Sequence, residues 1–180
     1  TVRWIPLGNP TGVFGAVGTA QVIAAATSSG DIAICQLSAT LAIVLYKNAS
    51  NYPQAAIVDQ TGAKVSGHTP IQIEAAAAEQ TMQIIKVSAT TAIAIWGGGS
   101  GARAVHLTVS GTTVTAGTVV AVSGGNSNAT AVCMLTATKF IASYYAISGD
   151  LLHARTLTLS GTTLTANTEY TVATSPGSSV

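Results

Sequence analysis

The chain has 180 residues, a mass of 17.9 kDa and a net charge of +1, and only 7% of its residues are charged. A nucleic-acid-binding protein needs a face rich in Lys and Arg, which seven scattered basic residues do not supply. The apolar content of 48% argues against a disordered chain, yet no apolar run approaches the roughly 20 residues of a membrane span. We therefore expect neither a nucleic acid nor a membrane among its partners.

The first 17 residues predict a docking arm. Prolines at positions 6 and 10 cannot donate ladder hydrogen bonds, so this segment is unsuited to a strand, while its apolar side chains favour contact with another surface. We expect the arm to hold neighbouring subunits through Arg3, Trp4, Ile5, Pro6 and Leu7.

Residues 18–24 predict a lone strand. Residues 18–23, GTAQVI, align with GTVVAV at 117–122, which ends one of the repeats described next. A lone strand leaves an unpaired edge. It would therefore complete the third repeat of its own chain or add to a neighbouring copy.

Three tandem copies of a pattern about 50 residues long follow, at 34–74, 84–123 and 132–173. Thr, Val, Ile and aromatic residues alternate in each copy, which predicts four short antiparallel strands per copy. A Ser-Ala-Thr or Thr-Ala-Thr segment makes the first turn. The second turn contains Gly62, Gly111 or Gly161, because Gly adopts the positive φ that tight hairpins require.

The second strand of each copy is apolar on both faces. The sequences LAIVLY, TAIAIW and FIASYY, at 41–46, 91–96 and 140–145, predict central strands covered on both sides. Segments 74–80 and 123–129 connect the copies and are predicted to be loops. The sequence thus predicts an all-β domain over 18–173, with a tail at 174–180.

Cys35 and Cys133 occupy the same repeat position, where the middle copy has Ile85. A position that accepts both Cys and Ile is typical of a small buried apolar slot. We expect two free core thiols, with a bridge or cross-link as the alternative. Neither Cys has further soft ligands nearby, so no metal site is expected.

Two sets of repeat-equivalent residues are the candidate binding residues. The aromatic set ends the second strand of each copy and is either a row of core side chains or a set of stacking platforms for sugar rings. The polar set begins the third strand and consists either of exposed loop ends or of donors beside each aromatic ring. The candidate glycan-binding residues are Tyr46, Trp96 and Tyr144, with Gln54, Arg103 and His153.

Catalytic and cofactor motifs are not evident. His68, His106 and His153 fall at three different repeat positions, and the acidic residues are scattered. The glycine-rich segment 97–103 lacks the Gly-Lys-Ser/Thr ending of a phosphate-binding loop. We therefore predict that the protein is not an enzyme and uses no cofactor.

The units over 18–172 resemble the blade-like Thr-rich repeats of phage and bacterial β-propeller proteins. SGTTVTAGT at 110–118 and SGTTLTANT at 160–168 are the most specific segments of this resemblance. It implies four-stranded blades and a non-enzymatic structural protein at the virion surface, such as a capsid decoration (cement) protein or a head-fibre component. Its partners would be other copies of itself and other virion proteins, chiefly the capsid.

Three units and a strand are fewer than the 4–8 blades of typical propellers. Copies could associate to finish a ring, the chain could be part of a longer one, or three units could close as a β-trefoil or β-prism. The last arrangement would favour the alternative function, a lectin-like carbohydrate-binding module.

Overall fold

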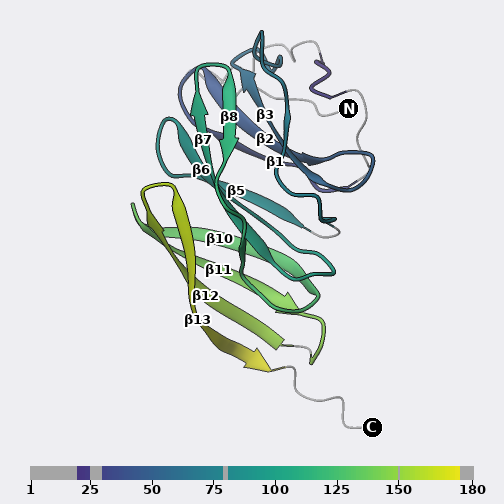
Figure 1. The fold of residues 1–180 in the computed structure, drawn as a ribbon, viewed down its shortest axis with the longest axis vertical. Helices are drawn as coiled ribbons and strands as arrows, with labels where there is room; N and C mark the ends of the chain where they lie inside the picture. The colour runs from purple at the N-terminus through teal and green to yellow at the C-terminus, as the bar shows by residue number, and fades with distance from the viewer. Residues whose placement is uncertain (1–19, 25–29, 79–80, 150, 175–180) are drawn as a thin grey trace, which may run out of the picture.

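The computed structural model describes residues 20–24, 30–78, 81–149 and 151–174. Within these ranges the protein is all-β, with three antiparallel sheets and no helix, and so without a helix that could cross a membrane (Figure 1). The predicted arm residues Arg3, Trp4, Ile5, Pro6 and Leu7 lie outside the described residues, as do residues 18–19 and 175–180.

Each sheet is built from strands that are consecutive in the chain, so most connections within a sheet are short; the longest is the segment 60–70 of the first sheet. Sheet 1 has the order β1 (Ala33–Gln36), β2 (Leu41–Lys47), β3 (Pro53–Asp59), β4 (Ile71–Gln72). Sheet 2 has the order β5 (Met82–Lys86), β6 (Thr91–Trp96), β7 (Arg103–Ser110), β8 (Thr113–Ala116), and β9 (Val120–Ala121) also pairs with β7. Sheet 3 has the order β10 (Ser127–Thr136), β11 (Lys139–Ala146), β12 (Leu151–Ser160), β13 (Thr163–Thr174).

The turn chemistry predicted from the sequence is confirmed. Gly62, Gly111 and Gly161 have φ values of +80°, +57° and +60°, in the left-handed region that favours glycine. The Ser-Ala-Thr segment of sheet 2 also closes as a tight turn, because the backbone N–H of Val87 donates to the carbonyl of Thr91 at 2.9 Å. Local residue choice therefore fixes the hairpins independently of how the sheets pack.

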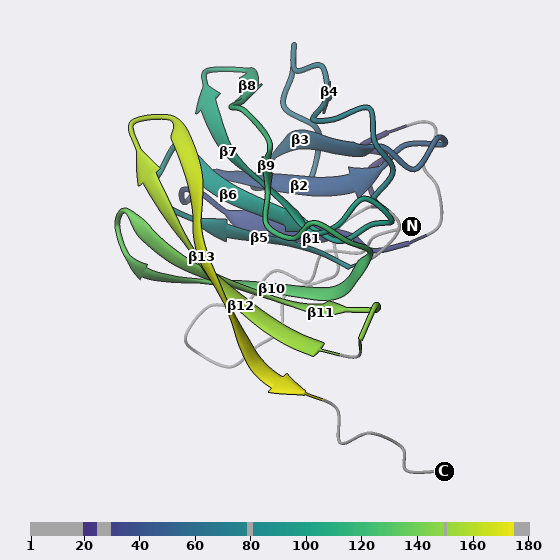
Figure 2. The same cartoon turned by 60° about the horizontal axis from the view of Figure 1, so that its bottom comes forward.

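The three sheets stack with sheet 2 in the middle, as Figure 1 shows. One apolar cluster joins sheet 1 to sheet 2, and a second joins sheet 2 to sheet 3. The first strands of the sheets lie near one another, because β5 contacts both β1 and β10 (Figure 2). Backbone-to-side-chain hydrogen bonds strengthen the second of these contacts: Val132 N donates to Gln83 Oε1 at 3.1 Å.

Each sheet has two distinguishable faces. We call the face that carries Tyr46, Trp96 or Tyr144 the leading face, and the opposite one the trailing face. Trp96 belongs to the cluster that joins the leading face of sheet 2 to the trailing face of sheet 1. Tyr144 belongs to the cluster that joins the leading face of sheet 3 to the trailing face of sheet 2. The stack therefore runs in one direction, with leading face on trailing face at both interfaces.

The prediction that all three second strands are covered on both sides is wrong for the third. β2 and β6 are buried along both faces, whereas β11 alternates buried and partly exposed residues. The reason lies in the stacking order, since sheet 3 is the last sheet in the described part of the chain and its trailing face meets no further sheet there. Cys133 lies on that face and is exposed, so it is free but not a core thiol, while Cys35 is free and half-buried.

The predicted lone strand 18–24 is not a strand in its described part, residues 20–24. Ile23 and Ala24 instead pack against the leading face of sheet 1, beside a buried cluster that includes Val44 and Tyr46. This segment therefore contacts the face of sheet 1 through its apolar side chains, in place of the predicted pairing along a sheet edge.

Candidate functional site

The structure brings each candidate aromatic residue opposite its candidate polar residue. Tyr46 pairs with Gln54 across β2 and β3, and Trp96 pairs with Arg103 across β6 and β7. Tyr144 pairs with His153 across β11 and β12. Directly opposed residues of antiparallel strands project from the same face of a sheet. The three pairs therefore occupy equivalent places on the three leading faces.

The aromatic rings are buried. Tyr46, Trp96 and Tyr144 are only 6%, 1% and 1% exposed, because the leading faces of sheets 2 and 3 are covered by the preceding sheets. A ring that stacks on a sugar needs an accessible face. These exposures give the glycan-platform hypothesis no support and favour its alternative, a row of core side chains.

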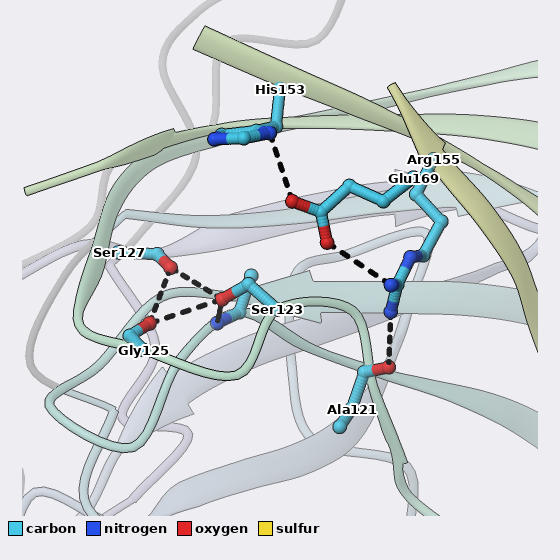
Figure 3. A network of polar contacts seen from close by, with 8 residues as sticks. Ala121, Ser123, Gly125, Ser127, His153, Arg155 and Glu169 are labelled. Carbon is cyan, nitrogen blue, oxygen red and sulfur yellow. Dashed lines mark hydrogen bonds and ion pairs between the residues drawn. The ribbon is translucent and has the colours of Figure 1, made fainter. Parts of the chain in front are cut away.

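The Tyr144–His153 pair continues into a cluster of charged groups. The two rings stack with centroids 5.4 Å apart and planes 13° from parallel. Glu169 of β13 reaches both neighbours on β12: its Oε1 lies 2.8 Å from His153 Nδ1, and its Oε2 accepts a hydrogen bond from Arg155 Nη2 at 3.0 Å (Figure 3). His153 Nδ1 makes no hydrogen bond of acceptable geometry, and the contact is an ion pair only where the imidazole is protonated.

Burial, together with the nearby carboxylate of Glu169, raises the pKa of Tyr144 far above its usual range. Its phenol therefore keeps its proton at every physiological pH. The hydroxyl is enclosed and makes no well-aligned hydrogen bond, so it has the position of a core side chain rather than of an acid–base group.

A second polar network lies beside this cluster, as Figure 3 shows, in the segment that leads from sheet 2 to sheet 3. Ser123 Oγ accepts a hydrogen bond from the buried backbone N–H of Ala102 at 2.8 Å and lies 2.5 Å from Ser127 Oγ. Both hydroxyl oxygens also lie within hydrogen-bond distance of the carbonyl of Gly125, at 3.1 and 2.8 Å, so one hydroxyl can donate to this carbonyl while the other donates to its neighbouring hydroxyl. In the cluster around Glu169, Arg155 Nη1 also donates to the carbonyl of Ala121 at 3.4 Å. The two networks fasten the end of sheet 2 to sheet 3.

Sequence analysis missed the Arg155–Glu169 pair. A regular hairpin closed at Gly161 would place residue 168 opposite Arg155, as the pairing of Leu157 with Ala166 shows. A bulge between those pairs adds a residue to β13 and brings Glu169 into place. The signal available in the sequence was two opposite charges near mirror positions of one hairpin, in a chain with few charges.

The remaining titratable candidates do not converge. His106 is buried on β7, and burial lowers its pKa, so it stays neutral. His68 Nδ1 lies 2.8 Å from the carbonyl of Thr112. No cluster of three or more His, Cys, Asp or Glu side chains suited to a metal ion occurs in the described part of the chain.

Replacing Glu169 with glutamine should lower the free energy of unfolding by about 1 kcal/mol. The amide keeps the size of the side chain but loses the charge facing Arg155 and His153. Those side chains are 22% and 12% exposed, and Glu169 is 32% exposed, so water screens part of the interaction. Urea unfolding measures the change, which should shrink at high salt. Asp31→Asn, at an exposed position, is the control and should change stability little.

In comparisons with known proteins, the chain matches no protein-family model and no curated sequence.

Proposed function

We propose that the protein is a non-enzymatic structural component of a phage virion, at the virion surface, as a capsid decoration protein or part of a head fibre. The observation that carries the proposal is that the candidate binding side chains are buried in the protein interior. The side chains that could have formed a binding site, Tyr46, Trp96 and Tyr144, are buried, the latter two between stacked sheets. The residues are thus used for packing rather than for chemistry.

The composition supports the same role. Only 7% of residues are charged and the net charge is +1, so little repulsion keeps free copies apart. A chain of this kind suits permanent incorporation into an assembly, where neighbours cover its surface. The all-β stack also supplies a body in which most connections within the sheets are short.

The propeller-like arrangement is part of the proposal. In a propeller, four-stranded blades pack face to face around an axis. The leading-on-trailing order of the sheets and the proximity of β1, β5 and β10 are compatible with three such blades. Ring closure would then require further sheets, from another copy or from a longer chain, because three blades are fewer than a closed ring contains.

The test is whether the chain is part of the particle and whether its arm attaches it. Virions from the source of the gene are purified on a density gradient, and their proteins are identified by mass spectrometry. We expect the chain in the particle fraction. Particles from which the chain has been removed should rebind the full chain but not a version lacking residues 1–17.

The control is Thr115→Glu, which adds a charge at an exposed position of β8 and should rebind normally. Absence of the chain from purified particles would refute the structural role. Equal rebinding of the arm-deleted chain would refute the role of the arm alone.

A further inference from the structure

Within the described part of the chain, two sheet faces of the stack meet no other sheet, and only one of them is exposed. The trailing face of sheet 1 is covered by sheet 2, and that of sheet 2 by sheet 3. The leading face of sheet 1 is also buried, with Ile23 and Ala24 packed against it. The trailing face of sheet 3 has no sheet on it, and its side chains are exposed or half-buried.

Strand register defines this face. Cys133 and Thr156 pair with Ile141, and Tyr170 pairs with Ala154. Tyr170 is 61% exposed and Leu152 is 39% exposed, so large apolar side chains stand in solvent. Exposed apolar residues gathered on one sheet face are typical of an interaction surface.

The face is less apolar than its two covered equivalents. The central cross-strand pair is Ile43–Ile57 in sheet 1 and Ile93–His106 in sheet 2, and all four residues are buried. In sheet 3 the corresponding pair is Ile141–Thr156, both half-buried. A whole sheet packed there would bury more hydroxyl groups than at the other interfaces. A narrow apolar segment that covers part of the face is a better match.

The chain itself contains such a segment. The 19 residues before Ala20 include Trp4, Ile5 and Leu7, with Pro6 between them. Nineteen extended residues span at most about 65 Å. Three sheets stacked about 10 Å apart are only about 30 Å deep, so reach is no obstacle.

The ends of the stack favour a second copy over the same chain. The segment that follows the arm, residues 20–24, packs on the leading face of sheet 1, at the opposite end of the stack from the trailing face of sheet 3. When two copies are placed head to tail, the end of one copy where residues 20–24 pack adjoins the free face of the other. The arm and the face are then complementary parts of one contact.

We infer that the trailing face of sheet 3 is the docking site for the N-terminal arm of a second copy of this chain. Trp4 and its apolar neighbours cover Leu152, Ile141 and Tyr170. The inference rests on the assembly role proposed for the arm and gives it a defined receptor. Because the contact is head to tail, it builds a ring or an open series of copies.

A mixing experiment tests the inference with the full chain in solution. Trp4→Glu disables the arm and leaves the face intact, whereas Tyr170→Glu disables the face and leaves the arm intact. Light scattering on a sizing column should give a multiple of 17.9 kDa for the unmodified chain and a monomer for each variant alone. We expect each change to raise the dissociation constant about tenfold or more.

An equimolar mixture of the two variants should form a complex of two chains, because one intact arm can still meet one intact face. Thr115→Glu is the charge-matched control and should assemble like the unmodified chain. Circular dichroism and thermal unfolding confirm that the variants are folded.

Three results would overturn the inference. They are a monomeric unmodified chain at all concentrations, assembly by Tyr170→Glu alone, and a mixture that stays monomeric. The last two would indicate, respectively, a different surface and a reciprocal contact that needs both arms and both faces at once. None of these measurements uses the virus particle. The inference can therefore fail while the virion role stands, and the virion role can fail while the inference stands.

Discussion

Replacing Trp96 with alanine should lower the free energy of unfolding by about 3–5 kcal/mol, the range observed when a large buried aromatic side chain is removed. Trp96 is 1% exposed and packs in the cluster that joins sheets 1 and 2, where it ends the buried strand β6. Its loss would leave a cavity that the hairpins cannot readily fill, because their turns fix the strands in place. Total stabilities of natural domains are only about 5–15 kcal/mol, so the variant should be close to unfolding at room temperature.

Chemical denaturation measures this loss, and Trp96→Phe provides the matched control. Phenylalanine keeps an aromatic ring in the cluster, so the loss should be clearly smaller. If Trp96→Ala were as stable as the unmodified protein, the ring would not be a core side chain, and the sugar-stacking hypothesis would need to be reconsidered.

Replacing Gly101 with alanine should cost about 3 kcal/mol or more, for two reasons that add. Its φ is +105°, a conformation that residues with a Cβ rarely adopt. A Cβ would also lie 2.5 Å from the carbonyl oxygen of Ser123 and 2.8 Å from its Oγ. Any shift that relieves this contact disturbs the hydrogen bond from the buried N–H of Ala102 to Ser123.

Gly124→Ala is the control for this prediction, because it lies in the adjoining loop and its Cβ would meet nothing within 4 Å. Thermal unfolding of both variants should show a large loss for Gly101→Ala and a change within about 0.5 kcal/mol for Gly124→Ala. Equal stability of the two would mean that the loop between β6 and β7 relaxes freely and that the serine network does not hold it.

The repeat pattern predicted the local structure well, except that sheet 2 has a fifth strand, β9, where four strands per copy were predicted. Glycine turns, short strands and the pairing of each aromatic with its polar partner follow from residue choice within about 20 neighbouring positions, so an alignment of the units reveals them. The sequence did not decide whether Trp96 and Tyr144 are buried or exposed, since an aromatic residue at the end of a strand is common in both environments. The packing of neighbouring sheets buries both rings.

The structure differs from the prediction where residues at the same repeat position are buried to different degrees, because their sheets occupy different places in the stack. Cys133 matches Cys35 in the sequence, yet only Cys35 lies between two sheets. Ile141 matches Ile43 and Ile93, yet it alone is incompletely buried. No local signal identifies the last sheet of a stack. The bulge that places Glu169 opposite Arg155 is likewise a property of the folded hairpin rather than of its sequence pattern.

Stacking in one direction also has a mechanical consequence. The two apolar clusters that join sheets connect only neighbours, sheet 1 with sheet 2 and sheet 2 with sheet 3. In an array of this kind, stability is a sum over units and the contacts between adjacent units. Tension applied along the chain would therefore be resisted by one sheet at a time, and sheets 1 and 3, each with one neighbouring sheet among the described residues, would yield before the sheet in the middle.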